Sequence, residues 1–586
     1  MHMKIPFLTL QARPRAWKAC LGLATALVLA ACATPWPTPT SGSSHFDASA
    51  LDTSAVAPQI ALPHLPEGWF HGAFMEIFVR AYQDSDGDGV GDLRGLISRL
   101  DYLKDLGIKG LWLMPVMPSA DRDHGYATTH YRAIEPAYGT LADFDELLKQ
   151  AHARGMGVVV DYVINHSAAD HPMFRQALQG PSNPFHDWYV WAEDEPQGWN
   201  IWDKNPWYLT STQPWNFKGE PKDLPPAPAG SKGFYFGTFG PHMPDFNLRK
   251  PEVRDYHFSS LRFWLNRGLD GYRLDAVPHM IENNAKDWND QPESRRLTKD
   301  LQDLIKAYPH RYVVCEATAE PQAYGDPAVC GGAFAFGYVH HFVDAALGKA
   351  DAVKQLARYY SQARPTMATF VSNHDKFAGQ RLWDQVQGDE TRYKLAAAGY
   401  LLQPGTPFIY YGEEVGQGGV NTLEGDLPLR SPMSWTADPS RAGFTTGQPF
   451  RPVAPNAATH NAAAQMRDPQ SIYHFYKSML ALRNSRVSVA RGRFEHGFAD
   501  GLVLGFQRVW GSQRTLVLIN YGSQAAEVKV PGVSGSSGAT TWTPLWASQG
   551  ASPHVPSVPS VSSVPSGTGE PVFNLPAQSV QVFDLR

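Results

Sequence analysis

Three acidic residues each follow a short apolar run and precede turn or helix signals: Asp275, Glu316 and Asp375. A carboxylate at the end of a buried strand is costly when it is unpaired, so its presence needs a reason. Three such ends in successive segments are typical of a barrel that carries its chemistry at the carboxyl ends of its strands. Two carboxyl groups that face each other across a glycosidic bond can hydrolyse it, one as proton donor and one as nucleophile or base. The third acid could hold sugar hydroxyls and oppose the positive charge that develops.

Three further polar residues have matching positions. Arg273 precedes Asp275 by two residues, so both side chains lie on the same face of the strand. We expect its charge to keep Asp275 ionised at neutral pH. His166 and His374 also follow apolar runs and could donate hydrogen bonds to sugar hydroxyls. An isolated acid is more often an ion-pair partner, but that explanation does not suit three acids and two histidines in equivalent contexts at strand ends.

Strand-like and helical patterns alternate along the segments that would position these residues. This alternation predicts right-handed βαβ units and a parallel sheet that is buried on both faces. We expect strands at 73–79, 110–114, 158–163 and 408–411, with a further strand that ends at Asp275. We expect helical or amphipathic segments at 93–106, 141–154, 253–268 and 471–483.

The alternation breaks in two places. Residues 167–247 are rich in Trp, Pro, Gly and Asn, and an irregular stretch of this length indicates an inserted subdomain. Beyond about residue 491, short strand-like runs predict a small all-β sandwich, with 532–569 as a loop or linker inside it. These runs are 502–509, 515–520, 526–530 and 579–585.

Composition excludes some classes of function. The 586 residues are 43% apolar and 18% charged, which allows a large core and does not suit a disordered chain. The net charge of −5 is small for this length, so we expect no nucleic-acid partner, which would need a concentrated basic face. Aromatic residues reach 12%, and most of them should serve packing, although some could stack on sugar rings.

The first residues read as a targeting signal. A basic start precedes an apolar stretch, 19–31, that is too short to span a bilayer. It ends in Leu29-Ala30-Ala31-Cys32, which resembles a bacterial lipobox with Cys32 as the lipidated residue; the alternative is an ordinary signal cut nearby. Residues 1–32 would be the signal and 33–66 a Pro/Ser/Thr-rich tether. We expect a secreted protein that is periplasmic or anchored in a membrane as a lipoprotein. The outer membrane is favoured over the inner membrane, because the residue after Cys32 is Ala33 and not the Asp that retains lipoproteins in the inner membrane.

Two cysteines remain after acylation of Cys32. An oxidising compartment would permit a disulfide between Cys315 and Cys330. Cys315 adjoins a candidate catalytic strand end, so it could equally be a buried free thiol. The sequence leaves both alternatives open.

Four segments resemble, in order, the motifs of the α-amylase family of glycoside hydrolases. They are 161–166, 271–275, Glu316 at its strand end, and 370–375. The resemblance covers the chain from about Glu67 to the C-terminus. It implies that Asp275 is the nucleophile of a retaining enzyme, Glu316 the acid/base and Asp375 the transition-state stabiliser.

The same resemblance implies an architecture. The catalytic eight-fold β/α (TIM) barrel would comprise 67–166 and 248–490, with a domain inserted after the third strand at 167–247 and a C-terminal β-sandwich at 491–586. Asp123-His124-Gly125-Tyr126 resembles the segment whose Asp and Tyr line the first sugar subsite, where Tyr126 would stack on the ring. Ala127 and His130 depart from the family pattern, which weakens this segment's assignment.

Two more segments are similar to parts of the family. Residues 243–247 resemble a fifth motif of bacterial enzymes intermediate between oligo-1,6-glucosidases and neopullulanases, and 429–435 resemble the oligo-1,6-glucosidase side. In relatives that cut α-1,6 bonds a Val commonly follows the nucleophile, and here that residue is Ala276. We therefore expect α-amylase-type cleavage of α-1,4 bonds in starch or maltooligosaccharides. An α-glucosidase, an oligo-1,6-glucosidase or a transglycosylase is the alternative, and a non-catalytic glycan-binding protein on the same fold is a third.

The loop 84–92 alternates carboxylates with glycines, a pattern that can wrap a hard cation with oxygen ligands. It is not an EF-hand, because Gly95 stands where a bidentate Glu would close the loop; a solvated acidic turn is the alternative. The resemblance implies a structural Ca²⁺ bound by Asp84, Asp86, Asp88, the Val90 carbonyl and Asp92. Asn165 matches a second calcium ligand of many α-amylases. We expect a monomer whose partner is an α-glucan, with membrane contact only through Cys32.

Overall fold

A computed structural model describes residues 51–121, 123–210, 233–531, 542–548 and 571–585. Among these residues, eight parallel strands form one sheet in the order β10-β9-β8-β7-β3-β2-β1-β11. Thr369, directly after β10, pairs in parallel with Pro407, directly before β11, so the sheet nearly closes into a barrel. The predicted barrel fold is confirmed. Its strands are β1 (Phe74–Ile77), β2 (Gly110–Leu113), β3 (Gly157–Tyr162), β7 (Gly271–Leu274), β8 (Tyr312–Cys315), β9 (Ala333–Phe334), β10 (Met367–Ala368) and β11 (Phe408–Tyr410).

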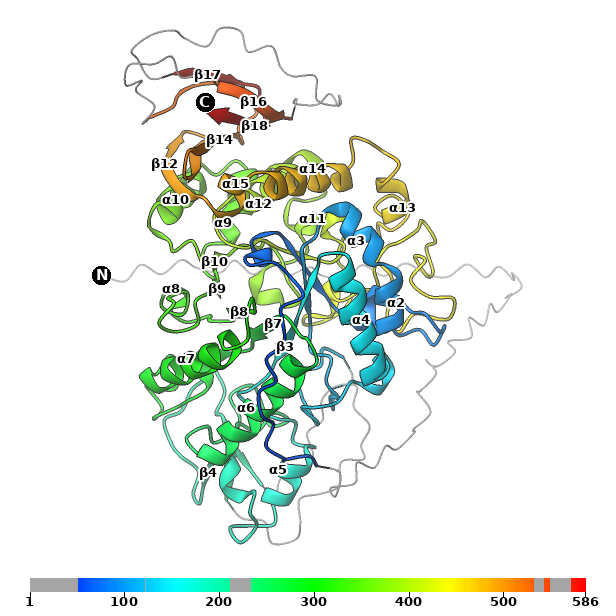
Figure 1. Ribbon diagram of the computed structural model, residues 1–586, viewed down its shortest axis with the longest axis vertical. Helices are drawn as coiled ribbons and strands as arrows, with labels where there is room; N and C mark the ends of the chain where they lie inside the picture. Colours follow the sequence, from blue (N-terminus) through cyan, green and yellow to red (C-terminus); the bar gives the residue numbers. More distant parts are fainter. Residues whose placement is uncertain (1–50, 122, 211–232, 532–541, 549–570, 586) are drawn as a thin grey trace, which may run out of the picture. The chain divides into compact units, whose positions relative to one another are not determined.

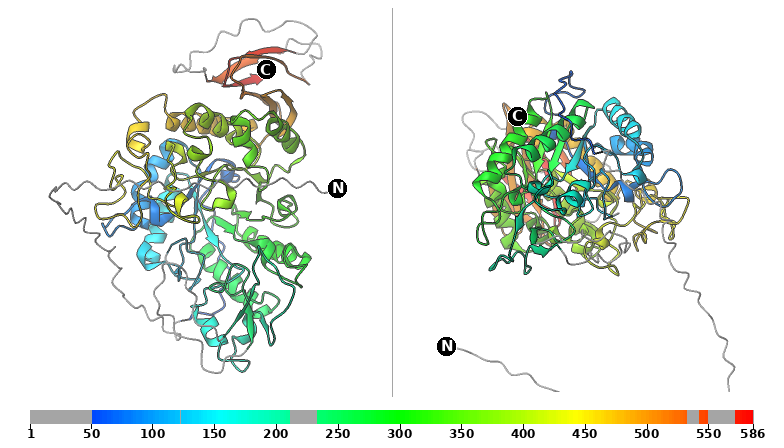
Figure 2. Two further views of the ribbon diagram at one scale, coloured as in Figure 1. Left: turned by 180° about the vertical axis from the view of Figure 1, so that it is seen from behind. Right: turned by 90° about the horizontal axis from the view of Figure 1, so that it is seen from below.

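Helices connect these strands, and their order can be followed by colour in Figures 1 and 2. The single amphipathic segment expected at 93–106 is two helices, because Arg99 leaves the helical conformation between them. Its guanidinium donates to the Gln83 side chain and lies over the Trp435 ring, 4.1 Å from the ring centroid. The helices are α1 (Val79–Tyr82), α2 (Leu93–Ser98), α3 (Leu100–Leu106), α4 (Leu141–Ala153), α6 (Pro251–Asn266), α7 (Pro292–Lys306), α8 (Pro321–Tyr324), α9 (His340–Ala346), α10 (Ala350–Gln362), α11 (Leu382–Gln385), α12 (Glu390–Leu401), α13 (Ala462–Gln465), α14 (Ile472–Ser485) and α15 (Val487–Arg491).

Local sequence explains the elements that carry the polar residues. Helix α4 begins with a capping box, in which Thr140 and Asp143 satisfy each other's backbone N–H groups. All residues of β3 and β7 are buried, as expected for parallel strands covered on both faces. Gly271 opens β7 at φ 152°, and a Cβ there would lie 1.8 Å from the Tyr312 carbonyl oxygen. The glycine therefore allows β7 and β8 to approach closely.

The expected insertion, 167–247, contains α5 (Pro172–Ala177) and a small sheet in its described residues. This sheet has the order β4-β6-β5, formed by β4 (Trp191–Ala192), β6 (Phe234–Phe236) and β5 (Trp207–Leu209). The backbone N–H of Phe246 donates to the Asn165 carbonyl, so the end of this segment returns directly to the end of β3.

After α15 the chain is all β in its described residues. One sheet has the order β12-β13-β14-β18-β16, and β15 pairs with β17 in a second. The expectation that 532–569 is only a loop was wrong, because 542–547 form β16 against β18. The strands are β12 (Arg493–Asp500), β13 (Val503–Trp510), β14 (Gln513–Asn520), β15 (Ala526–Lys529), β16 (Trp542–Ala547), β17 (Val572–Leu575) and β18 (Ser579–Leu585).

The expected signal peptide, Cys32 and residues 33–50 of the expected tether lie outside the described residues. The rest of the tether prediction, 51–66, was wrong, because this segment is bound to the barrel: Asp52 pairs with Arg132, and the Gln59 N–H donates to Asn266. None of the helices in the described part is long and apolar enough to cross a membrane. Cys315 and Cys330 form a disulfide, which joins the end of β8 to the segment before β9.

Candidate active site

Six charged side chains gather at the carboxyl ends of the barrel strands. All six are buried or largely buried, and they come from five strands or from the residues that follow them: Glu76, Asp161, Arg273, Asp275, Glu316 and Asp375. Parallel pairing of β3, β7 and β8 places three of these strand ends side by side. The three acids predicted from the sequence are therefore part of one buried polar group of residues.

Arg273 organises the first charge cluster. Its guanidinium donates to Asp275, contacts Asp161 Oδ1 at 2.8 Å and lies 2.9 Å from Glu316 Oε2. The carboxylates of Asp275 and Glu316 thus contact neighbouring nitrogens of one side chain, as two groups flanking a single bond should. Ala276 has left-handed backbone, φ 49°, and its N–H donates to Glu316 Oε2 at 3.1 Å. This turn ends β7 abruptly and fixes Asp275 beside Glu316.

From the sequence we expected the charge of Arg273 to keep Asp275 ionised. In the structure, other effects oppose that charge. Burial raises the pKa of Asp275 well above its usual range; Arg273 opposes this shift, and the charge of Glu316 adds to it. Burial also raises the pKa of Asp161, again against the effect of Arg273. One guanidinium faces three carboxyl groups, so the cluster should retain a proton near neutral pH. A shared proton is what a nucleophile and an acid need, because one must be ionised and the other protonated.

His374 links the first cluster to Asp375. Its Nδ1 lies 2.6 Å from Glu76 Oε1, and its Nε2 lies 3.1 Å from Asp375 Oδ2 and 2.8 Å from the Tyr126 hydroxyl. Burial lowers the pKa of His374, but the two carboxylates outweigh it and raise the value to about 10. The two carboxylates therefore favour the imidazolium form of His374. Burial raises the pKa of Asp375, but the His374 charge outweighs it and holds the pKa well below its usual range.

Tyr126 lies between Asp161 and His374. Its hydroxyl donates to Asp161 Oδ2 at 2.7 Å, and its ring stacks on His374 with 5.4 Å between ring centroids. The half-buried ring leaves part of its surface for a ligand. Tyr126 therefore joins Asp161 to the Asp375 side of the site.

A second charge cluster surrounds Arg430. Its guanidinium lies 3.2 Å from both Asp375 and Asp123 and 3.4 Å from Asp426. Asp123 also pairs with Arg451 at 2.7 Å. Burial raises the pKa of Asp123, but the two guanidinium groups outweigh it and hold the pKa well below its usual range. Asp123 was predicted as a sugar ligand. In the structure, Arg430 bridges Asp123 and Asp375.

Several residues of the site were missed as functional residues. Glu76 is a lone acid inside an apolar strand, which was a usable signal of a buried partner. Asp161 is likewise a lone acid inside an apolar strand, at the start of the motif 161–166. Arg430 and Arg451 reach the site from beyond β11, and no local pattern links them to Asp123.

His166 is less accessible to a sugar hydroxyl than the sequence suggested. The residue is buried, and its Nε2 lies 3.2 Å from the Tyr126 carbonyl. Burial lowers its pKa to about 3, so the ring is neutral. Next to it, burial raises the pKa of Asp245 to about 7, against hydrogen bonds from Thr238 and Asn165. Asp245 is thus a partner of Asn165 that the sequence did not identify.

The acidic loop brings three of its five predicted ligands together. Carboxylate oxygens of Asp84, Asp86 and Asp88 lie within 4.8 Å of one another, a spacing that suits one hard cation. The oxygens of Asp92 accept from Ser85 and from the Gly95 N–H, which caps α2, and its place among the ligands stays a prediction. The Val90 N–H donates to Asp88, and the Val90 carbonyl stays a prediction.

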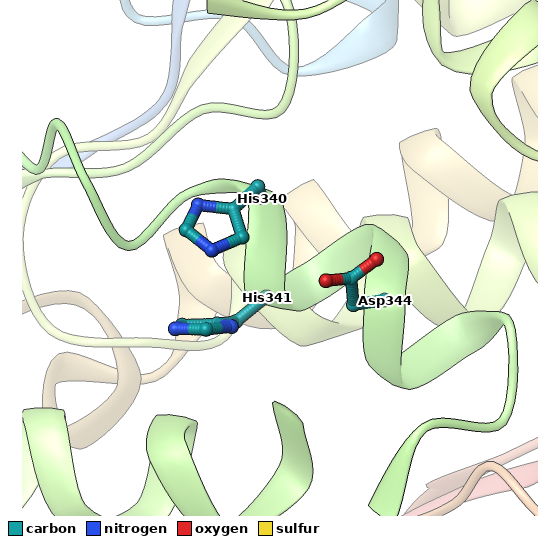
Figure 3. Close-up of side chains that lie close together, drawn as sticks. All are labelled: His340, His341 and Asp344. Atoms are coloured by element: carbon teal, nitrogen blue, oxygen red, sulfur yellow. The ribbon is translucent and has the colours of Figure 1, made fainter. Parts of the chain in front are cut away.

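Another group of possible metal ligands lies at the start of α9. His340, His341 and Asp344 have ligand atoms within 4.8 Å of one another, and Figure 3 shows the two rings one turn from the carboxylate. Lys349 Nζ already contacts Asp344 at 2.7 Å. We assign this group no part in the chemistry of the strand ends.

Comparisons with known proteins agree with this geometry. The family model for the α-amylase catalytic domain matches residues 76–492. The trehalose synthase/amylase TreS of Mycobacterium tuberculosis is 30% identical over 514 residues, which cover 79% of this chain and 82% of that protein. The oligo-1,6-glucosidase of Parageobacillus thermoglucosidasius is 27% identical over 540 residues, with coverage of 79% and 92%.

A solved structure shares the fold. The trehalose-6-phosphate hydrolase of Bacillus licheniformis superposes with a TM-score of 0.73 at 23% identity, covering 89% of this chain and all of that chain. At this identity the likeness shows the fold.

Proposed function

The chain belongs to the α-amylase family of glycoside hydrolases, and from that we propose that it is a retaining α-glucosidase. It would remove single glucose units from the non-reducing ends of short α-linked gluco-oligosaccharides. This departs from the α-amylase action expected first from the sequence. The relatives' printed activities, which include an oligo-1,6-glucosidase, support the change.

The Arg430 cluster is the observation that carries this proposal. Asp375 should touch the reacting sugar, and behind it stand Arg430, Asp123 and Arg451, joined by contacts of 2.7–3.2 Å. Arg430 and Arg451 have side chains only 4% and 11% exposed. A glucan chain could cross this place only by breaking buried ion pairs, which is costly. A substrate should therefore end here with one glucose residue.

The residues then divide the reaction between them. Asp275 attacks the anomeric carbon while Glu316 gives its proton to the leaving oxygen, so the glycosidic bond breaks and a glucosyl–Asp275 ester forms. Glu316 next takes a proton from water, which attacks the same carbon and releases glucose with its original anomeric configuration. Asp375, kept ionised by His374, opposes the positive charge of the transition state. Arg273 holds both reacting carboxyl groups in position.

The first products from maltoheptaose test the proposal. We expect glucose and maltohexaose in equal amounts at early times, resolved by chromatography. A mixture of maltose, maltotriose and maltotetraose at the same stage would instead identify an α-amylase. Parallel reactions with isomaltose and trehalose test the linkage, and Ala276 favours maltose as the best disaccharide.

We also propose that Asp84, Asp86 and Asp88 hold a structural Ca²⁺. Their loop packs on the segment before Arg451: Asp84 N–H donates to the Phe444 carbonyl, and Phe450 N–H donates to the Gly89 carbonyl. Burial raises the pKa of Asp88, and the charges of Asp86 and Asp84 add to this shift. A cation would remove that repulsion and brace the loop.

Chelation should therefore lower the melting temperature. Loss of an ion present at about a hundred times its Kd costs about 2.7 kcal/mol, which corresponds to about 2–3 °C for a chain of this size. Differential scanning calorimetry with EDTA and with added Ca²⁺ measures the shift. Asp86→Asn should abolish it, whereas Asp351→Asn, an exposed acid on α10, should retain it. Equal melting temperatures with and without Ca²⁺ would reject the site.

A further inference from the structure

Four aromatic residues from three separate segments form a cluster beside the catalytic strand ends. Trp202 lies in the inserted domain, Phe239 in its returning segment, and His279 and Trp288 between β7 and α7. The ring centroid of Trp202 lies 5.6 Å from that of Phe239, 5.5 Å from His279 and 5.6 Å from Trp288. His279 and Trp288 stack at 5.4 Å with an angle of 9°. Each neighbour limits the orientation of the Trp202 ring.

His279 connects this cluster to the end of β7, where Asp275 and Glu316 meet. Glu316, the proton donor, accepts the N–H of Ala276, and His279 follows three residues later in the same short segment. Phe239 contacts His166 at 5.2 Å between ring centroids. The Arg430 cluster surrounds Asp123 and Asp375 instead, and Glu316 takes no part in it. An aglycone that leaves past Glu316 therefore runs toward His279 and Trp202.

Trp202 has an unusual position for a packing residue. Ile201 and Lys204 exchange both backbone hydrogen bonds, at 2.9 and 3.0 Å, so Trp202 and Asp203 form the tip of a tight turn. Both tip residues have positive φ, 49° and 65°, a conformation that favours Asn-Gly and disfavours bulky side chains. Trp202 is nevertheless 55% exposed, so burial does not repay this strain. A side chain that is both strained and exposed indicates a ligand contact.

We propose that Trp202 is a stacking platform for the second glucose residue of the aglycone, supported by Trp288, His279 and Phe239. The face of a glucopyranose carries C–H bonds with partial positive charge, which an aromatic face attracts. The first aglycone glucose would lie at Glu316, and the next would reach Trp202, whose ring contacts His279 and Phe239. This inference rests on the proposed α-glucosidase function and names its preferred substrate: oligosaccharides of three or more glucose residues, rather than disaccharides.

The test compares substrates that differ only in the aglycone. α-Glucosyl fluoride has none, maltose has one glucose residue and maltotriose has two. For the wild-type enzyme we expect kcat/KM to rise from maltose to maltotriose. Trp202→Asn removes the ring but suits the turn, so it should fold with an unchanged or higher melting temperature. In this variant kcat/KM should fall about tenfold on maltotriose and stay unchanged on maltose and on the fluoride.

A matched control and distinct failures keep the two proposals separate. Trp510→Ala removes a tryptophan that is 47% exposed on β13 and should leave the whole profile unchanged. If the wild type fails to hydrolyse α-glucosyl fluoride and maltose, the proposed function is wrong. If it hydrolyses them, the platform is rejected when maltotriose is no better than maltose, or when Trp202→Asn keeps the wild-type gain.

Discussion

Replacing Asp275 by Asn should reduce kcat on maltotriose by at least about 10⁴-fold, because no other group can form the ester with the anomeric carbon. Glu316→Gln should reduce the same rate by about 10²- to 10⁴-fold, since it removes only proton transfer. On α-glucosyl fluoride, whose leaving group needs no proton, Glu316→Gln should retain most of the formation rate of the glucosyl ester. Initial rates by glucose release, with burst kinetics for the fluoride, measure these effects.

A control variant separates chemistry from folding. Glu293→Gln changes an acid at the start of α7, outside the site, and should behave as the wild type in both assays. Wild-type turnover of maltotriose by Asp275→Asn or Glu316→Gln would overturn the roles proposed for them.

Glu316→Gln should also change the pH dependence of kcat/KM in a known direction. Burial raises the pKa of Asp275, and the negative charge of Glu316 adds to this shift while Arg273 opposes it. Because the nucleophile must be ionised, the acid limb of kcat/KM reports this pKa. On α-glucosyl fluoride, which needs no proton from residue 316, the form with both carboxyl groups ionised is active, so loss of the Glu316 charge in Glu316→Gln should move the acid limb to lower pH. A limb that stays in place or moves to higher pH would show that the two carboxyl groups do not interact as the geometry indicates.

Arg273→Met should have the second largest effect, on stability as well as on activity. The guanidinium is 1% exposed and contacts Asp161, Asp275 and Glu316. Without it these acids face one another in a buried site, which should cost about 3–5 kcal/mol of the free energy of unfolding. Hydrolysis of both maltotriose and α-glucosyl fluoride should be lost, because the nucleophile would remain protonated.

The stability deficit of Arg273→Met should shrink as the pH falls. Loss of the cation raises the folded-state pKa values of the acids further, so the folded variant binds protons more tightly than the unfolded chain. Its stability relative to the wild type therefore rises from pH 8 to pH 5. Urea unfolding at both pH values measures this. Arg267→Met, which breaks the exposed pair of Arg267 with Asp145, should cost no more than about 1 kcal/mol at either pH. A deficit in Arg273→Met that is equally small would contradict the cluster.

Much of the barrel could be predicted because its signals are local. Each apolar run of four to six residues marks a buried parallel strand, and β2, β3 and β7 lie where these runs are. The same runs located Asp275 and Glu316, because an acidic residue directly after an apolar run is recognisable from the sequence alone. Helices α4 and α14 lie where helical spacing predicts them, and in the structure Thr140 and Ser471 cap them.

What the sequence missed depends on contacts between distant segments. Arg430 and Arg451 are about three hundred residues from Asp123, and only the closure of the barrel brings them together. Arg99 breaks an amphipathic helix because Gln83 and Trp435 bind its side chain. Strand β16 lies in a stretch of turn-forming residues and exists through its pairing with β18. The disulfide between Cys315 and Cys330 was left open, because pairing depends on a distance that no spacing supplies.

Trapping of the covalent intermediate tests the central claim most directly. A 5-fluoroglucosyl fluoride should react with the wild-type protein and leave one fluoroglucosyl group, which peptide mass spectrometry can locate. We predict that the added mass lies on Asp275. Its presence on another acid, or full turnover of maltose with inverted anomeric configuration and no trapped sugar, would contradict a retaining mechanism through Asp275.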